Sequence, residues 1–250
     1  MIKILISGAL GKMGANVLSA IKEDPEVTAV CGVDRLEDLS GSIPIYDDYD
    51  KVSEDVDVVI DFSSPKALDG ILGFISKTGA SAVLCSTGYT KEDLDKIEKA
   101  SKTNAIFRSA NMSLGVNVLI ELVKTAVKNL TGFDVEIIEK HHNQKVDAPS
   151  GTALMLADAI KQVDNDKFYV YGREGIVGKR DANEIGIHAI RGGNIVGEHD
   201  VIFAGTDEVV TLSHHASDRK VFAFGAVKAS KFIHKKKNGL FNMTDMLNEK

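Results

Sequence analysis

The chain has 250 residues, of which 44% are hydrophobic and 26% are charged, and its formal net charge at pH 7 is -6. This composition is that of a globular protein with one large or two small domains. The negative charge argues against nucleic acid as a partner, because proteins that bind nucleic acids usually carry a basic face. The only basic block, the lysines at 235–237, is expected to be the solvated end of a helix that begins near Val221.

The two cysteines, Cys31 and Cys85, lie in apolar, strand-like stretches, where a free cysteine behaves as a small buried hydrophobic residue. A disulfide framework or a metal site is therefore not expected. The first residues do not resemble a signal peptide, and no apolar stretch approaches the roughly 20 residues of a membrane span. We expect a cytoplasmic protein that binds neither nucleic acid nor membrane.

The N-terminus follows the order strand, glycine turn, helix. Ile2–Ser7 is apolar, Gly8, Gly11 and Gly14 follow at once, and apolar residues then recur at helical spacing over 17–21. In a dinucleotide-binding turn, such glycines allow the tight turn, the approach of the pyrophosphate and close helix packing. The spacing is GxxGxxG, with Leu10 where the commoner GxGxxG motif has its middle glycine. By itself the motif is weak, since a purely structural glycine turn would look the same.

A second apolar strand, Val27–Val33, ends in Asp34, at the distance of about 20 residues where dinucleotide-binding folds place an acid. Such an acid accepts hydrogen bonds from the adenosine ribose, whereas Arg35 can pair with a 2′-phosphate. The acid favours NADH and the arginine favours NADPH, so we expect tolerance of both cofactors. The alternative is an ordinary Asp-Arg pair at the end of a strand.

The alternation of strand and helix then continues. Strands are expected over 56–62, 81–85 and 105–108, and helices over 65–77 and 91–102. Repeating units of this kind predict a Rossmann-type, doubly wound parallel sheet in an α/β protein. Because ligands of such sheets lie beyond the carboxyl ends of the strands, three loops are candidate contacts, over 63–65, 86–88 and 109–112.

The second half changes character. A helix is expected over 116–130 and a last helix from Val221, with β-rich runs over 185–191, 195–204 and 208–216 between them. Gly192-Gly193 and Gly205-Thr206-Asp207 break these runs and are interpreted as antiparallel hairpin connections. We therefore expect a second α+β domain with an open, mostly antiparallel sheet. The predicted division is a dinucleotide-binding domain, 1–111 and 220–250, and a substrate-binding and oligomerisation domain, 112–219.

Residues 139–153, EKHHNQKVDAPSGTA, hold the densest group of chemically active side chains. An apolar run before them predicts a strand and helical spacing after them predicts a helix, so they are expected on a strand-to-helix loop. Histidine titrates near neutral pH and lysine is cationic, so both suit an anionic substrate that takes up a proton. Unpaired N–H groups at a helix start can hold a carboxylate. The residues concerned are His141, His142 and Lys145 for the first role and Ser150, Gly151 and Thr152 for the second.

This segment resembles the signature of the dihydrodipicolinate reductase family, NAD(P)H-dependent enzymes of the diaminopimelate route to lysine. The likeness covers essentially the whole chain, including residues 173–175, 191–199 and 239–241, for which the sequence offers no physical reason. It implies reduction of 4-hydroxy-tetrahydrodipicolinate to tetrahydrodipicolinate with NADH, NADPH or both. It also implies a homotetramer built on the β-rich domain, and a C-terminal segment that returns to the nucleotide domain.

The resemblance assigns roles residue by residue. It makes His141 the acid/base residue and Lys145 the proton donor, with His142, Gly151 and Thr152 binding substrate. The implied cofactor contacts are Gly8, Ala9, Leu10, Gly11, Lys12, Met13, Asp34, Arg35, Cys85, Ser86, Thr87, Ser109, Ala110, Asn111 and Met112. Many members carry glycine where Cys85 stands, so its side chain is expected to point into the core.

Several polar residues outside this set are expected to be structural. His214, His215, Asp218 and Arg219 form a second polar cluster before the last helix, with a structural or cofactor-adjacent role. His188 and His199, in strand runs, are interpreted as packing or interface residues.

Two other functions fit part of the sequence. A different two-domain NAD(P) oxidoreductase, such as an aspartate or homoserine dehydrogenase-like protein, would share the first half but not the segment 139–153. A non-enzymatic redox sensor would bind NAD(H) and use the β-rich domain only to oligomerise. Substrate profiling separates the first alternative from the reductase, and saturable cofactor binding without substrate-dependent oxidation would favour the second.

Overall fold

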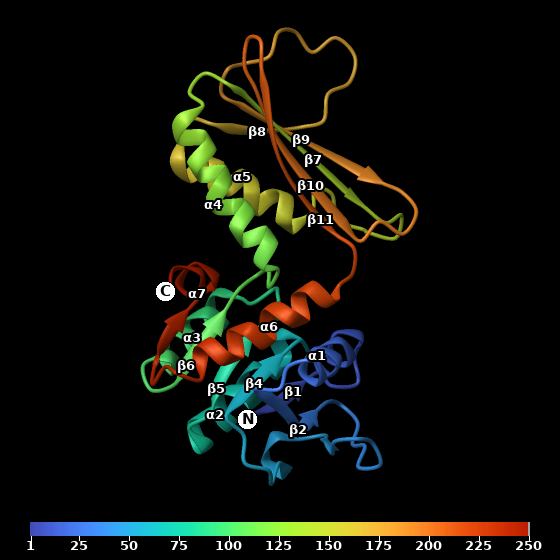
Figure 1. Cartoon of the computed structure of the whole chain (residues 1–250), viewed down its shortest axis with the longest axis vertical. Coiled ribbons are helices and arrows are strands. Elements are labelled where there is room, and N and C mark those ends of the chain that lie inside the picture. The colour runs from blue at the N-terminus through green and yellow to red at the C-terminus, as the bar shows by residue number, and fades with distance from the viewer. Residues whose placement is uncertain (250) are drawn as a thin grey trace. The chain divides into compact units, whose positions relative to one another are not determined.

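The computed structural model describes residues 1–249, and the chain forms two compact units (Figure 1). The first consists of Met1–Leu114 and the segment from Arg219 onward, and the second of Gly115–Asp218. No helix within residues 1–249 is both long and apolar enough to cross a membrane.

The first unit is built on a seven-stranded sheet in which every pair of neighbours is parallel. Its spatial order is β12-β6-β5-β4-β1-β2-β3. From β1 the chain builds outward through β2 and β3, and then returns to the other side of β1 with β4. The topological switch point, where ligands of such sheets bind, therefore lies between β1 and β4. The strands are β1 (Ile2–Ser7), β2 (Val27–Val33), β3 (Ile45–Tyr46), β4 (Val58–Asp61), β5 (Ser81–Leu84), β6 (Ala105–Arg108) and β12 (Gly239–Phe241).

Helices cover both faces of this sheet, because the strands are apolar on both sides. Ile4 and Ile6 pack with α1 (Lys12–Lys22) and α6 (Lys220–Ile233), whereas Leu5 packs with α2 (Leu68–Thr78) and α3 (Lys91–Ser101). The unit also contains the short helices η1 (Tyr49–Lys51), η2 (Pro65–Ala67) and α7 (Met243–Asn248). The predicted doubly wound parallel sheet is confirmed.

Strand β12 explains the family-like residues near the C-terminus. Gly239 and Phe241 lie opposite Ala105 and Phe107 in a parallel ladder with β6, and the Phe241 ring stacks edge-on with Phe232 at 5.6 Å. The sequence pattern did not predict this strand, because three residues are too few to show a periodicity.

The second unit contains a five-stranded sheet in the order β11-β10-β7-β9-β8. Its strands are β7 (Asp134–His141), β8 (Phe168–Tyr171), β9 (Glu184–Arg191), β10 (Gly197–Ala204) and β11 (Val209–Ala216), and its helices are α4 (Leu114–Asn129) and α5 (Gly151–Val163). Both helices pack on one face of the sheet (Figure 1). The antiparallel ladders β11-β10 and β10-β7 hold more residue pairs than the parallel ladders β7-β9 and β9-β8. The expected α+β unit with a mostly antiparallel sheet is confirmed.

One of the two predicted hairpins is wrong. Gly205-Thr206-Asp207 does connect the antiparallel strands β10 and β11. Gly192-Gly193, in contrast, connects β9 to β10. These two strands are not neighbours in the sheet, because β7 lies between them. The edge of β7 pairs with β9 in parallel, with Ile137 opposite Ile187 and His141 opposite Arg191. Strand β8 was not predicted, since Phe168 and Tyr171 are exposed and its pattern does not alternate.

An ionic network on the face of β7 away from the helices explains the family-like Arg173. Arg173 donates to both oxygens of Glu136, at 2.9 and 2.8 Å, and also to Glu184. Arg180 and His188 contact the same Glu136 carboxylate. Burial alone would raise the pKa of Glu136, but these donors lower it to about 2. The network therefore holds the loop between β8 and β9 against the central strand.

Gly14 is required by close packing in the first unit. A Cβ at this position would lie 2.5 Å from the carbonyl oxygen of Ala9 and would also overlap with that of Gly8. We expect Gly14→Ala to reduce the free energy of unfolding by about 1–3 kcal/mol, because neither backbone oxygen can move away. Urea unfolding measures this change. The matched control is Gly73→Ala within α2, where no atom lies within 4 Å of the added Cβ, and a gain of about 0.5–1 kcal/mol is expected. Equal stability of the Gly14 variant and the unaltered protein would contradict the argument.

Candidate active site

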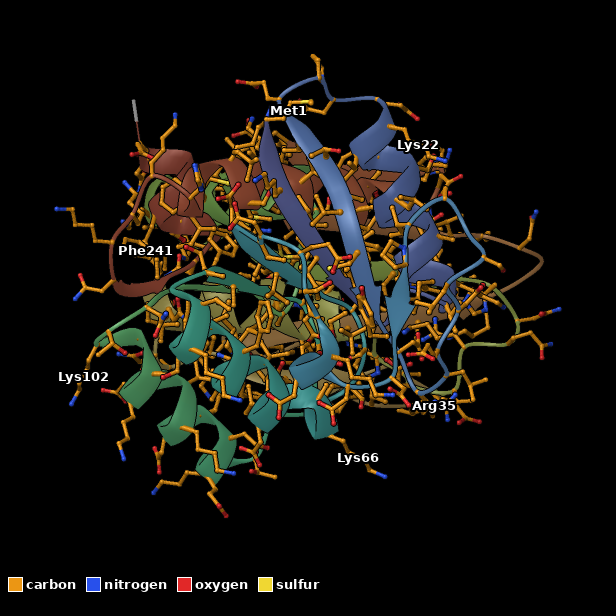
Figure 2. All side chains as sticks on the ribbon, turned by 90° about the horizontal axis from the view of Figure 1, so that it is seen from below. Met1, Lys22, Arg35, Lys66, Lys102 and Phe241 are labelled. Atoms are coloured by element: carbon orange, nitrogen blue, oxygen red, sulfur yellow. The ribbon has the colours of Figure 1, made fainter. Side chains whose placement is uncertain are left out.

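A cavity of about 660 Å³ lies at the carboxyl ends of β1, β2 and β4. Gly8, Gly11, Asp34 and Arg35 line it, as the sequence predicted for a dinucleotide site. Figure 2 shows Arg35 and Lys66 at the same end of the unit, opposite the end that carries Met1. Lining residues that were not predicted include Tyr49, Phe62, Lys66 and Ala67.

The glycine turn has the geometry that a pyrophosphate needs. Gly8 has a φ of 80°, and its N–H donates to the carbonyl oxygen of Val33 at 2.8 Å. Gly11 is the N-cap of α1 and offers no capping side chain, and the first turn holds no acidic residue. The N–H groups of that turn therefore have no acidic side chain of their own helix to compete with an anion.

Asp34 joins the second strand to the glycine turn. Its carboxylate accepts hydrogen bonds from the N–H of Leu10 at 2.9 Å and from that of Arg35 at 2.7 Å. The acid that is expected to bind the ribose is therefore held at a defined distance from the phosphate-binding turn.

Asp61, the last residue of β4, connects three strand ends and was missed by the sequence analysis. It is fully buried and accepts hydrogen bonds from the hydroxyls of Ser7, at 2.8 Å, and Ser86, at 2.6 Å. Ser63 adds its hydroxyl and its N–H, at 2.5 and 3.0 Å. The available signal was an acidic residue that ends the otherwise apolar strand VVID, because a buried carboxylate requires several donors.

A second cavity of about 350 Å³ shares residues 62–64 with the first and extends to the end of β5. Cys85, Ser86 and Thr87 line it. The Cys85 side chain is buried in the core, as expected, and burial raises the pKa of its thiol well above the usual value. Cys85 is therefore not a nucleophile.

The remaining predicted cofactor contacts lie outside these two cavities. Leu10 and Lys12 are exposed, Ala9 packs towards Gly32 of β2, and Met13 is half-buried against the core. In the loop after β6, the Ser109 hydroxyl donates to the carbonyl oxygen of Asn111. The side chain of Met112 is buried in the core, and its contact with the cofactor stays a prediction. Ala110, in the same loop, is exposed.

In the second unit, His141 is the last residue of β7 and not part of the following loop, which corrects the expectation. Its Nδ1 lies 2.6 Å from Oε2 of Glu139, two residues earlier on the same face of the strand. His142 and Lys145 form the turn that follows, with the Lys145 N–H donating to the His142 carbonyl oxygen at 3.2 Å. The Lys145 ammonium pairs with Asp147 at 2.8 Å.

The side chain of Ser150 has a structural role at the start of α5. Its side chain is buried and caps α5 by accepting from the N–H of Ala153, and it also contacts Nε2 of His199 at 3.0 Å. Its own N–H donates to Glu139. Both polar groups of Ser150 are thus engaged inside the protein, and direct substrate binding by Ser150 stays a prediction. Gly151 is exposed and Thr152 half-buried at the helix start, where they remain candidates.

Two further buried groups near His141 were not predicted. Arg191 donates to both oxygens of Glu139, at 2.8 and 2.7 Å, and to the carbonyl oxygen of Asp147. The His199 ring packs edge-on against that of His141, with the ring centres 5.2 Å apart. Burial lowers the pKa of His199 to about 4, so this ring is neutral near pH 7. The packing role predicted for His199 agrees with these contacts.

His188 and His215 contact acidic residues on the face of the sheet away from the helices. His188 lies 2.8 Å from Glu136, and His215 lies 2.9 Å from Glu198. Within residues 1–249, no group of three or more histidine, cysteine or acidic side chains is arranged to hold a metal ion.

Comparison with known proteins identifies consistent relatives along the whole chain. Residues 2–112 match the family model described as dihydrodipicolinate reductase, N-terminus, and residues 115–247 match that of the C-terminus. The 4-hydroxy-tetrahydrodipicolinate reductase of Caldanaerobacter subterraneus subsp. tengcongensis is 54% identical over 248 residues, which cover 99% of this chain and 98% of the relative. That of Clostridium novyi is 48% identical over 252 residues and covers 100% of both chains.

Among solved structures, dipicolinate-bound dihydrodipicolinate reductase from Paenisporosarcina sp. TG-14 has a TM-score of 0.82 and covers 97% of each chain at 24% identity. A probable dehydrogenase from Thermotoga maritima has a TM-score of 0.62, covers 98% of this chain and 92% of its own, and is 12% identical. At these identities the structural likeness supports the fold alone.

The Asp61 contacts predict a specific effect on dinucleotide binding. We expect Asp61→Asn to raise the Kd for NADH about tenfold, because an amide offers one acceptor oxygen where the three serines require two. Isothermal titration measures this Kd. The matched control is Asp57→Asn at the opposite end of β4, where the carboxylate accepts a hydrogen bond from the N–H of Lys3 at 2.8 Å. An unchanged Kd in the Asp61 variant would remove this residue from the organisation of the site.

Proposed function

The chain belongs to the dihydrodipicolinate reductase family, and from this membership we propose that it reduces 4-hydroxy-tetrahydrodipicolinate to tetrahydrodipicolinate in lysine biosynthesis, with loss of the hydroxyl group as water and with NADH or NADPH as the reductant. The observation that carries the proposal is the combination of a glycine-lined dinucleotide cavity with the His141, Lys145 and α5 helix-start arrangement in one chain. The Clostridium novyi reductase matches this chain over its full length, so both parts are present together in a relative.

The first unit fits a nicotinamide dinucleotide. Gly8 and Gly11 would face the pyrophosphate, while Asp34 and Arg35 would share the adenosine ribose and any 2′-phosphate. Ser86 and Thr87, in the second cavity, would contact the nicotinamide end. When bound, the nicotinamide supplies hydride to the unsaturated ring of the substrate. The protein's own contribution is to hold the cofactor and to exclude water at the strand ends.

The second unit supplies the substrate contacts and the proton. Dipicolinate, the ligand of the Paenisporosarcina enzyme, is a flat dicarboxylate, and we propose that this unit accepts a ring of the same type. His142, Gly151 and Thr152 would hold its carboxylates. His141, through Nε2, and Lys145 would deliver the proton that quenches the negative charge developing on the ring. His141 is suited to this transfer because its other nitrogen is already held by Glu139.

Two wider proposals follow from the same membership. We propose a homotetramer that forms through the face of the second sheet left uncovered by α4 and α5, where Ile190 and Val209 are 47% and 62% exposed.

We also propose that the enzyme works in the cytoplasm, where a reducing environment keeps the two buried thiols free.

The activity is tested by a coupled assay, in which a synthase forms the substrate from pyruvate and aspartate semialdehyde and the oxidation of NADH or NADPH is followed by absorbance. Synthase-dependent oxidation supports the proposal, and the ratio of the two rates shows how Asp34 and Arg35 share the ribose site. Cofactor binding without any such oxidation would rule the proposed reaction out.

Substitution of the two proton-transfer residues separates chemistry from binding. We expect His141→Gln and Lys145→Ala each to lower kcat by about 10²-fold or more, while the Kd for NADH changes little because both residues lie in the second unit. Steady-state kinetics and titration of NADH measure the two quantities. Near-native kcat in both variants would exclude them from the mechanism.

The homotetramer predicts a mass in solution four times that of the 26.9 kDa chain, measured by light scattering during gel filtration. Ile202→Arg places a charge at the centre of the uncovered face, on β10, and is expected to give smaller species with an intact fold. A monomeric native protein would overturn the proposal.

A further inference from the structure

The carboxylate of Glu139 is completely buried, at 0% exposure, and the groups that bind it belong to the proposed active site. Oε1 accepts from Nη2 of Arg191 at 2.7 Å and from the N–H of Ser150 at 3.0 Å. Oε2 accepts from Nη1 of Arg191 at 2.8 Å and contacts Nδ1 of His141 at 2.6 Å. Four donors therefore converge on one carboxylate from β7, β9 and the start of α5.

We propose that Glu139 and Arg191 act together as positioning residues for His141, fixing which ring nitrogen carries the proton and governing how readily the other nitrogen takes up and releases one. The inference rests on the proposed role of His141 in proton transfer and deepens it. Neither Glu139 nor Arg191 needs to touch the substrate.

The tautomer follows from the chemistry of the partner. An ionised carboxylate only accepts hydrogen bonds, so the Nδ1 that lies 2.6 Å from it must be the donor. In the neutral ring, Nε2 then carries the lone pair and is the nitrogen available for proton transfer. The ring is held from one side by His199, which packs edge-on against it, and Gly197 leaves room beside Nε2, since a Cβ there would lie only 3.1 Å from this atom.

The charged groups around His141 come from every element packed on it. Glu139 lies on the same strand, Arg191 on β9, Lys145 in the following turn and neutral His199 on β10. Burial lowers the pKa of His141, the Glu139 carboxylate opposes this, and Lys145 and Arg191 add to the lowering. Burial would raise the pKa of Glu139, but its bonds with Arg191 and His141 keep it below the usual value, so the carboxylate is ionised.

Arg191 therefore has a role beyond holding Glu139 in place. An uncompensated carboxylate at 2.6 Å would stabilise the doubly protonated imidazolium and raise the pKa of His141. The guanidinium cancels that charge while the hydrogen bond to Nδ1 is kept. The ring is thus oriented by the carboxylate, yet it gives up its proton more readily than it would beside an uncompensated charge.

The two partners are expected to act in opposite directions, which a purely structural role would not produce. Glu139→Gln removes the negative charge and should move the pKa of His141 down by roughly one unit, whereas Arg191→Met should move it up by a similar amount. Both are expected to lower kcat about tenfold or more while the Kd for NADH stays the same. The amide introduced by Glu139→Gln offers one acceptor oxygen in place of two, so it cannot satisfy Arg191, Ser150 and Nδ1 together.

The measurement has two independent readouts in the full-length enzyme. The first is the pH profile of kcat/KM, in which the limb of His141 is the one that disappears in His141→Gln. The second is NMR titration of the His141 ring, assigned with the same variant, which reports the pKa whether or not the residue takes part in catalysis. Thermal melts accompany each variant.

The matched control is a similar group on the opposite face of the same strand. Glu136 also binds one arginine with both oxygens and contacts a histidine at 2.8 Å. Glu136→Gln should leave the titration of His141 unchanged. Arg191→Lys keeps the charge without the two-pronged geometry, so its pKa shift should be smaller than that of Arg191→Met and part of the lost kcat should return. It also serves as the folded variant if Arg191→Met does not fold.

Opposite shifts in the two variants support the proposal. Shifts in the same direction, or a His141 pKa that stays within about 0.2 units in Glu139→Gln and Arg191→Lys, would overturn it. Near-native turnover in His141→Gln would instead refute the proposed function of His141, and the NMR titration would then still decide whether the pair controls the ring.

Discussion

Burial of a charged carboxylate in the centre of a sheet determines which donors and which opposite charge must surround it. Removing an ion from water costs several kcal/mol unless donors and an opposite charge surround it. Glu139 meets this requirement with Arg191, Ser150 and His141. Because these donors come from β7, β9 and the start of α5, the parallel pairing of β9 with β7 and the position of α5 are tied to the same carboxylate that orients the histidine.

The first unit solves the same problem with different chemistry. Asp61 is equally buried, but its donors are the hydroxyls of Ser7, Ser63 and Ser86, the N–H of Ser63 and, at 3.4 Å, the hydroxyl of Tyr89. These neutral donors join the strand ends without cancelling the negative charge of Asp61. This arrangement suits a residue whose role is to hold the loops at the strand ends in place. At Glu139 a cation is needed as well, because the neighbouring histidine must remain able to release a proton.

Local pattern predicted most of the architecture. Strands β1, β2 and β6 begin and end where the apolar runs do, because a strand buried on both faces is a continuous apolar segment bounded by turn residues. The pairing of β9 with β7 was not predictable in this way. Two β-rich runs joined by Gly192-Gly193 resemble a hairpin, but β7 lies between them in the sheet and pairs with β10 along one edge and with β9 along the other.

By itself the sequence determined the fold class, the family, and the residue types at the two sites, since periodicity, glycine spacing and the segment 139–153 are local properties of the chain. Tertiary structure decided which polar side chains are buried and which partners they have. Ser150 is held in the interior by Glu139 and His199, while Glu139 and Arg191, 52 residues apart, form one group. The physical reason is that a side chain's charge and hydrogen bonds depend on neighbours that only the packing of distant strands brings into contact.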